Sequence, residues 1–341
     1  MSKTRAGYFF EDYYLGQVFD HATPRTLSGG ERALYTALYP ARYALYSSDE
    51  FARNCGLPQS PIEDLAAFHI VFGKTVPDIS LNAVANLGYA ECRFLRPVYV
   101  GDTLNSRSEV IGLKQNSSGK TGVVWVCSTG VNQRGEPVLE YVRWVMVRKR
   151  DLNAPAPETV IPALKPALSA QDLALPEGFH FDGYNFTQAG EKHRLANYDI
   201  GEVIDHIDGV TIEEAEHMIA TRLWQNTAKV HFDASQRPDG KRLIYGGHVI
   251  SMARALAFNG LANAQMMVAI NAGSHINPCF AGDTLRARST VLDKAEIGGI
   301  GAIRLQMLAY RGDAGQDLSR QDGKYPPHVL LELDFWALMP A

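Results

Sequence analysis

One stretch of this sequence matches another stretch about half the chain away, and this happens twice in the same order. Residues 15–21 (LGQVFDH) match residues 200–206 (IGEVIDH), with their glycines 185 positions apart. Residues 97–104 (PVYVGDTL) match residues 278–285 (PCFAGDTL), with their glycines 181 positions apart. A period of about 180 residues is far too long for a solenoid unit, so the pattern predicts a duplicated domain.

The segment between the two copies predicts where they are joined. Residues 151–178 hold five of the 17 prolines of the chain. Proline fixes its own backbone angle and removes an N–H donor, so a helix or a sheet ladder does not continue through such a segment. We therefore expect a first domain over residues 1–150, a stiff linker over residues 151–178 and a second domain over residues 179–341.

Both copies show the same order of predicted elements. A helix comes first, over residues 31–45 in one copy and 212–223 in the other. A second, apolar helix follows, over residues 62–74 and 248–262. Alternating strands then follow in the first copy, over residues 93–98, 103–111, 122–129 and 138–147. One buried helix followed by a run of antiparallel strands indicates an α+β fold with the sheet wrapped around the helix.

Composition and charge narrow the class of partner. Hydrophobic residues make up 46% and charged residues 21% of the chain, which is typical of a globular protein. The net charge is −4 and basic residues form no run, which argues against nucleic acid or an anionic membrane as the main partner. Glu11 and Asp12 stand where a signal peptide would need its apolar core. The four cysteines form no CxxC pair of the kind that binds a structural metal. We therefore expect a cytoplasmic protein without a structural metal.

The repeated Gly-Asp-Thr-Leu block, which follows an apolar helix, resembles the MaoC-like hydratases of the hot-dog superfamily. The hydratase motif of that family is Asp-x-Asn-Pro-aliphatic-His. In the second copy, residues 225–231 (QNTAKVH) place His231 at the histidine position and Asn226 at the aspartate position, with Ala228 where the family has asparagine. In the first copy, Tyr46 stands at the histidine position. The resemblance implies a tandem (double) hot-dog fold in which the second copy is catalytic and the first is not.

A more specific resemblance rests on the length, the duplication, residues 225–231 and residues 245–248 (YGGH). Together these features resemble the mesaconyl-CoA hydratases along essentially the whole chain. This resemblance implies reversible addition of water to mesaconyl-CoA (2-methylfumaryl-CoA), giving β-methylmalyl-CoA (3-methylmalyl-CoA). The implied partner is an acyl-CoA thioester with no added cofactor, and a homo-oligomer stays open.

Hydration of a double bond conjugated to a thioester needs a base for water, an acid for the α-carbon and a donor for the enolate oxygen. His231 suits the proton transfers because imidazole titrates near neutral pH. Asn226 can only hold water or substrate, so Asp233 is a candidate partner for the histidine. Gly246 and Gly247 precede the second helix, whose start carries free N–H groups. The family resemblance places the thioester oxygen at the amide of Gly247.

The free carboxylate of such an acyl chain needs a polar or cationic partner. His248 at the same helix start is one candidate. Arg42 and Tyr46 from the first copy are others, if the two copies face each other. No cluster of lysine and arginine marks a site for the CoA phosphates.

Three other functions remain compatible with the sequence. An (R)-specific enoyl-CoA hydratase for other acyl chains shares the fold and the motif. A hot-dog thioesterase would use a carboxylate on or beside the central helix, and Glu63 and Asp64 of the first copy supply two. A non-catalytic acyl-binding protein would leave His231 without a role.

Overall fold

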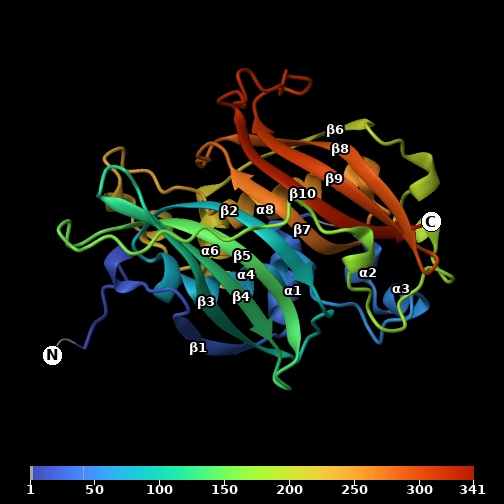
Figure 1. The fold of residues 1–341 in the computed structure, drawn as a ribbon. Helices are drawn as coiled ribbons and strands as arrows, with labels where there is room; N and C mark the ends of the chain where they lie inside the picture. The colour runs from blue at the N-terminus through green and yellow to red at the C-terminus, as the bar shows by residue number, and fades with distance from the viewer. Residues whose placement is uncertain (1–2, 41) are drawn as a thin grey trace.

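The structure, a computed structural model, describes residues 3–40 and 42–341. Residues 1–2 of the first predicted domain, and Ala41 beside the predicted Arg42, lie outside this description. Within the described residues, ten strands form one antiparallel sheet that curves around the longer helices (Figure 1). We call the part from β1 to β5 the first half and the part from β6 to β10 the second half.

The helices of the first half are α1 (Gly29–Leu38), α2 (Ala44–Ser47), α3 (Asp49–Asn54) and α4 (Asp64–Thr75), with the 3₁₀ helix η1 (Phe10–Asp12) and the π-helix η2 (Val76–Ser80). Its strands are β1 (Val18–Thr26), β2 (Ala83–Phe94), β3 (Thr103–Gln115), β4 (Thr121–Val131) and β5 (Pro137–Arg148). The turn η3 (Ala170–Asp172) lies between the halves. The elements of the second half are helices α5 (Phe186–Ala189), α6 (Glu214–Leu223), α7 (Lys229–Phe232), α8 (Gly246–Leu256) and α9 (Phe258–Leu261), the turns η4 (Leu195–Asn197) and η5 (Ala234–Gln236), and strands β6 (Val203–Thr211), β7 (Met266–His275), β8 (Thr284–Ile297), β9 (Ile300–Arg311) and β10 (Val329–Pro340).

The strand order shows the duplication directly. The sheet runs β1-β3-β4-β5-β2 and continues β7-β10-β9-β8-β6, so each half has the same order read from its outer edge. The predicted tandem hot-dog fold is confirmed. The two sheets are also joined into one, because β2 pairs with β7 through Tyr89↔Gly273, Ala90↔Ala272, Cys92↔Ile270 and Arg93↔Ala269.

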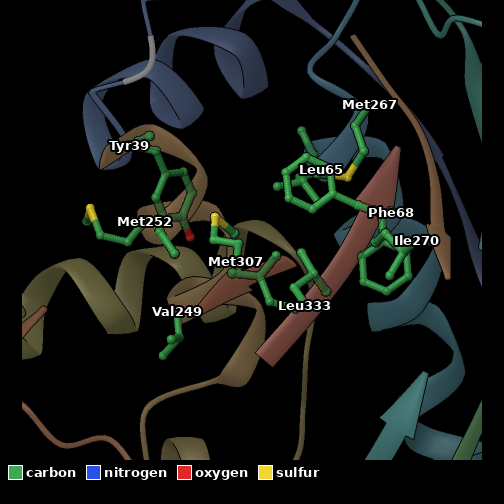
Figure 2. Close-up of a cluster of buried hydrophobic side chains, with 14 of the residues drawn as sticks. Tyr39, Leu65, Phe68, Val249, Met252, Met267, Ile270, Met307 and Leu333 are labelled. Atoms are coloured by element: carbon green, nitrogen blue, oxygen red, sulfur yellow. The ribbon is translucent and has the colours of Figure 1, made fainter. Parts of the chain in front are cut away.

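The central helices α4 and α8 lie inside the curve of the sheet. All residues of α4 are buried, as expected of a helix that is apolar on nearly every side. Figure 2 shows side chains of both helices, including Leu65 and Phe68 of α4 and Val249 and Met252 of α8, in one cluster with Ile270 of β7. The hydrophobic core therefore continues across the boundary between the halves.

The first predicted helix, over residues 31–45, was too long. Helix α1 begins after Ser28, whose side chain accepts a hydrogen bond from the Gly30 amide while Glu31 bonds back to the Ser28 amide. It ends at Leu38 because Pro40 follows, and proline disfavours helical backbone in the residue before it.

The predicted strand over residues 93–98 was also wrong. Strand β2 runs from Ala83 to Phe94, and its pairing with β5 shifts register at three places along its length. Such bulges break the alternation of buried and exposed side chains by which strands are found in sequence. Strands β3, β4 and β5 lack this problem over most of their length and match their predicted ranges with small extensions.

The proline-rich segment 151–178 is held to both halves. Val160 forms an isolated bridge with Leu113 of β3. Leu168 accepts a hydrogen bond at its carbonyl from Trp336 Nε1 (3.1 Å) and donates its amide to Asn271 Oδ1 (2.9 Å). Its role as a linker, and the boundaries on either side of it, stay a prediction.

At Gly73, in the last turn of α4, the backbone of the first half lies against the backbone of the second. A methyl group at Gly73 would lie 1.7 Å from the carbonyl oxygen of Trp224, the buried residue that ends α6. Only glycine permits this contact. The chain then turns at Gln225, which has a left-handed φ of 54°, and so reaches Asn226 of the predicted site.

Replacing Gly73 by alanine is expected to lower the free energy of unfolding by at least about 1–3 kcal/mol, because the backbone of one half must move away from the other. Urea denaturation measures this. Gly29→Ala is the matched control, since a methyl group at Gly29 in α1 meets open space. Equal stability of the two variants would contradict the described packing.

Candidate active site

A cavity of about 290 Å³ lies between the two halves. The second half contributes predicted site residues, and these are Asn226, His231 and Gly246. The first half contributes polar side chains that the sequence did not single out, and these are Ser80, Asn86, Tyr89 and Arg143. The structure therefore brings together at one cavity residues from distant parts of the chain.

His231 lies in the short helix α7 and retains some accessible surface, which it presents to the cavity. Its Nδ1 atom is 2.7 Å from the carbonyl oxygen of Leu243. A carbonyl oxygen only accepts, so Nδ1 carries the proton and Nε2 is left with a lone pair. Burial lowers the pKa of His231 to about 4, because the protein around the ring disfavours the charged form. The ring is thus a neutral base at neutral pH.

Asn226 is buried at the bend that leads into α7. Its side-chain Oδ1 atom accepts a hydrogen bond from the backbone amide of Ala228 (3.0 Å). Its backbone N–H donates to the carbonyl oxygen of Thr221 (3.0 Å). An aspartate could accept the Ala228 bond equally well, so the bend does not require asparagine. The side-chain NH₂ group of Asn226 is left as a donor at a residue that lines the cavity.

Gly246 and Gly247 form the first turn of α8. The preceding residue, Tyr245, makes no side-chain cap, so the amides of Gly246 and Gly247 receive no capping bond; Gly246 lines the cavity, and Gly247 is buried directly behind it. A methyl group at Gly246 would lie 2.2 Å from the ring of His275, and one at Gly247 would lie 2.5 Å from the ring of Tyr245. Both positions therefore need glycine, and the crowded helix start offers N–H groups and the positive end of the helix dipole.

His275 and Tyr89 join the two halves at the cavity. The Tyr89 hydroxyl lies 3.1 Å from His275 Nε2, across the β2–β7 junction. Burial lowers the pKa of His275 to about 4. The sequence analysis missed both residues. A signal did exist, because His275 lies three positions before Pro278 of the repeated block, where the first copy has Phe94.

Asp233 lies apart from the cavity. Its carboxylate accepts hydrogen bonds from the amide (3.0 Å) and hydroxyl (2.6 Å) of Ser235 and from Gln236 (2.8 Å). These bonds lower the pKa of Asp233, led by the one from the Ser235 hydroxyl. The side chain thus caps the turn η5, and the geometry offers it no contact with His231.

The three residues predicted to hold the substrate carboxylate also lie away from the cavity. His248 is buried, with Nδ1 2.9 Å from the Tyr39 hydroxyl. Arg42 is exposed and its guanidinium lies over the ring of Phe258 (4.7 Å to the centroid). Tyr46 is buried and donates its hydroxyl hydrogen bond to Asp64.

Tyr46 and Asp64 occupy, in the first half, the place of the cavity in the second. By position before and at the start of the central helix, Tyr46 corresponds to His231 and Asp64 to Gly246. Asp64 also accepts a hydrogen bond from the amide of Met267 (2.8 Å). Burial raises its pKa to about 7. Side chains of the protein itself therefore fill this helix start.

Among residues 3–40 and 42–341, no group of three or more histidine, cysteine, aspartate or glutamate side chains is placed to hold a metal ion. In the same part of the chain, every helix is too short or too polar to cross a membrane.

Known proteins share this architecture along the whole chain. The family model described as mesaconyl-CoA hydratase matches residues 2–316. The chain belongs to this family. Membership confirms the resemblance found in the sequence and fits the tandem hot-dog fold.

Individual members of the family are close relatives. The mesaconyl-CoA hydratase of Cereibacter sphaeroides is 67% identical over 341 residues, covering 99% of both chains. The β-methylmalyl-CoA dehydratase of Chloroflexus aurantiacus is 56% identical over 347 residues, again covering 99% of each.

Solved structures agree with the fold. The crystal structure of a MaoC-domain dehydratase from Chloroflexus aurantiacus J-10-fl superposes with a TM-score of 0.97 at 56% identity, covering 100% of this chain and 99% of that one. The double hot-dog protein Rv0216 of Mycobacterium tuberculosis gives a TM-score of 0.76 at 26% identity, covering 98% of both chains.

The ring of His231 is expected to stay neutral, with the proton on Nδ1, from about pH 7.5 down to about pH 5.5, where an unperturbed histidine is mostly charged. The reason is that burial depresses its pKa, so protonation begins only as the pH approaches about 4. Spectra of ¹⁵N-histidine-labelled protein measure both tautomer and charge. The signal that disappears in His231→Gln assigns the ring, and a titration centred near 6.5 would contradict the description.

Proposed function

We propose that this chain catalyses the reversible hydration of mesaconyl-CoA (2-methylfumaryl-CoA) to β-methylmalyl-CoA (3-methylmalyl-CoA). The observation that carries the proposal is its 67% identity, over 341 residues, to the mesaconyl-CoA hydratase of Cereibacter sphaeroides. The cavity supports the same chemistry, because it sets a neutral histidine and an open helix start side by side. The proposed substrate class is therefore an acyl-CoA thioester.

In the proposed reaction, Nε2 of His231 takes a proton from water as the water oxygen bonds to the β-carbon. The electron pair of the double bond moves toward the thioester oxygen, giving an enolate. The imidazolium then returns the proton to the α-carbon, which balances the addition with one group serving as base and acid. Because burial makes the charged ring unstable, the imidazolium gives up its proton readily.

The open amides at the start of α8 are proposed to bind the thioester oxygen as negative charge builds on it. Preorganised backbone donors of this kind are worth most in a site that excludes water. Gly247 is the family position for this contact, and Gly246 lines the cavity beside it. Asn226 is proposed to orient water or substrate through its NH₂ group.

We also propose that only the second half carries out the proton transfers. The support is that Tyr46 and Asp64 bond to each other where the second half has His231 and Gly246. A substrate cannot enter the first-half position without displacing this buried pair. The first half is then free to contribute other side chains to the site of the second.

His231→Ala is expected to lower kcat on mesaconyl-CoA by roughly 10²–10⁴-fold, because the proton transfers lose their carrier. Tyr46→Phe and Asp233→Ala are expected to lower kcat far less, since neither side chain lines the cavity. Loss of the absorbance of the conjugated enoyl thioester measures the rate.

Melting temperatures of the same variants separate a chemical from a structural role. His231→Ala should melt close to the parent protein. Tyr46→Phe leaves the buried Asp64 with one hydrogen-bond partner fewer, so this variant is expected to melt at a lower temperature. An active His231→Ala variant would refute the mechanism, and complete inactivity of Asp233→Ala would restore the aspartate predicted from sequence.

The thioesterase alternative is tested by the same assay with a thiol reagent added. Glu63 and Asp64, the carboxylates that a thioesterase would use, lie at the start of α4, outside the cavity that holds His231. Hydration removes the enoyl absorbance without releasing free CoA. Release of thiol in step with that loss would favour hydrolysis.

The proposed place of action is the cytoplasm. Support comes from Cys55, Cys92, Cys127 and Cys279, which are all free thiols. Unpaired cysteines are typical of reducing compartments. Association into a homo-oligomer stays a prediction.

A further inference from the structure

We propose that Arg143, on β5 of the first half, binds the free carboxylate of the acyl chain. The inference rests on the proposed function and adds to it the side chain that selects a dicarboxylic acyl group. It assigns to the first half the recognition of the substrate and leaves the proton transfers to the second.

Arg143 is buried without a counter-charge. Its exposed fraction is 0%, and none of the ion pairs among residues 3–40 and 42–341 includes it. Burial lowers its pKa, and the side chains that oppose this shift are tyrosines rather than carboxylates. Burying a guanidinium without an anion costs free energy of folding. Its position beside a cavity therefore indicates an anionic ligand.

Neutral neighbours hold the guanidinium in position. Nη2 donates to Thr75 Oγ1 (2.7 Å), and Ser80 Oγ lies 3.4 Å from both Nη1 and Nη2. The ring of Phe72 lies under the group, 4.2 Å from Cζ to the centroid. Such contacts fix the orientation of the planar donor group while leaving its charge available to a ligand.

Unpaired polar atoms occur on two residues that line this cavity. Nε of Arg143 is buried and has no hydrogen-bond partner among the described residues. The same is true of both amide atoms of Asn86, which lines the same cavity from β2. Buried polar groups are almost always paired, so the two unpaired donors among these atoms, Arg143 Nε and Asn86 Nδ2, indicate a ligand that accepts hydrogen bonds from them. A carboxylate can accept from the guanidinium and from the Asn86 NH₂ group.

The position of the free carboxylate in the substrate fits a cation in the same cavity as His231. In mesaconyl-CoA the free carboxylate is attached to the β-carbon, the carbon that receives the hydroxyl group. Arg143 and His231 line the same cavity, and the rings of Phe72 and Tyr245, tilted by 37° with centroids 6.0 Å apart, lie along its wall. An anchored carboxylate would thus hold the β-carbon for attack by the water that His231 activates.

The test compares two thioesters that differ at this carboxylate. In (E)-2-methylbut-2-enoyl-CoA a methyl group replaces the carboxylate of mesaconyl-CoA, while the double bond and the CoA part are the same. Arg143→Met is expected to lower kcat/KM for mesaconyl-CoA by roughly 10²-fold or more. The same substitution is expected to leave kcat/KM for the neutral thioester within about threefold or to raise it. Arg107→Met, which removes an exposed arginine on β3, is the matched control and should change neither value.

Each outcome separates the inference from the proposed function. If the unmodified protein hydrates both thioesters equally well, the proposed dicarboxylic substrate is wrong. If it prefers mesaconyl-CoA and Arg143→Met keeps that preference, the assignment of Arg143 alone is wrong. Equal losses on both thioesters would mean that Arg143 contacts the shared CoA part, which also overturns the assignment.

A second variant keeps the inference testable if Arg143→Met does not fold. Asn86→Leu removes the other donor and keeps Arg143 in place. It is expected to reduce the preference for mesaconyl-CoA in the same direction by a smaller factor, of about tenfold. An unchanged preference for mesaconyl-CoA would count against a substrate carboxylate bound beside Asn86.

Discussion

Four residue pairs between β2 and β7 join the two halves into one sheet, and the position of the site depends on this junction. The pairing sets Tyr89 against His275, and Asn86 in the first part of β2 lines the same cavity as Gly246 of α8. Gly73 allows α4 and the end of α6 to approach, so that the bend at Asn226 reaches the same place. Without the junction, neither half would enclose a cavity with both a base and a cation.

The two halves share a backbone plan but differ at the few positions that decide chemistry. At the start of the central helix, Gly246 has no side chain and lines the cavity, whereas the Asp64 carboxylate fills the corresponding place in the first half. Before that helix, His231 presents a lone pair where Tyr46 bonds to Asp64. The two halves are therefore not equivalent, although their strand order is the same. The first half could place Arg143 and Asn86 at the cavity of the second, where they would serve recognition rather than proton transfer.

Features set by local pattern could be predicted from the sequence, and features set by contact between the halves could not. The repeated blocks and the apolar helices predicted the tandem hot-dog fold, and the register of residues 225–231 predicted that His231 and Asn226 would lie together. His248 was one of three candidates for binding the substrate carboxylate because it lies at the same helix start as Gly247. A helix turns about 100° per residue, so its side chain instead points to Tyr39. Arg143 lies in a strand of mostly apolar residues, so the sequence did not mark it as a site residue. Its position at the cavity became visible only in the structure, where β5 and β2 both line the cavity.

The most direct measurement of the central claim, that one site is built from both halves, is a crystal structure with 2-methylsuccinyl-CoA. This saturated thioester keeps the carboxylate and the methyl branch of the substrate but has no double bond to hydrate. The account predicts the thioester oxygen at the amides of Gly246 and Gly247, with the carboxylate within hydrogen-bond distance of Arg143 and Asn86. An acyl chain bound with its carboxylate in solvent, or at the start of α4 beside Asp64, would contradict it.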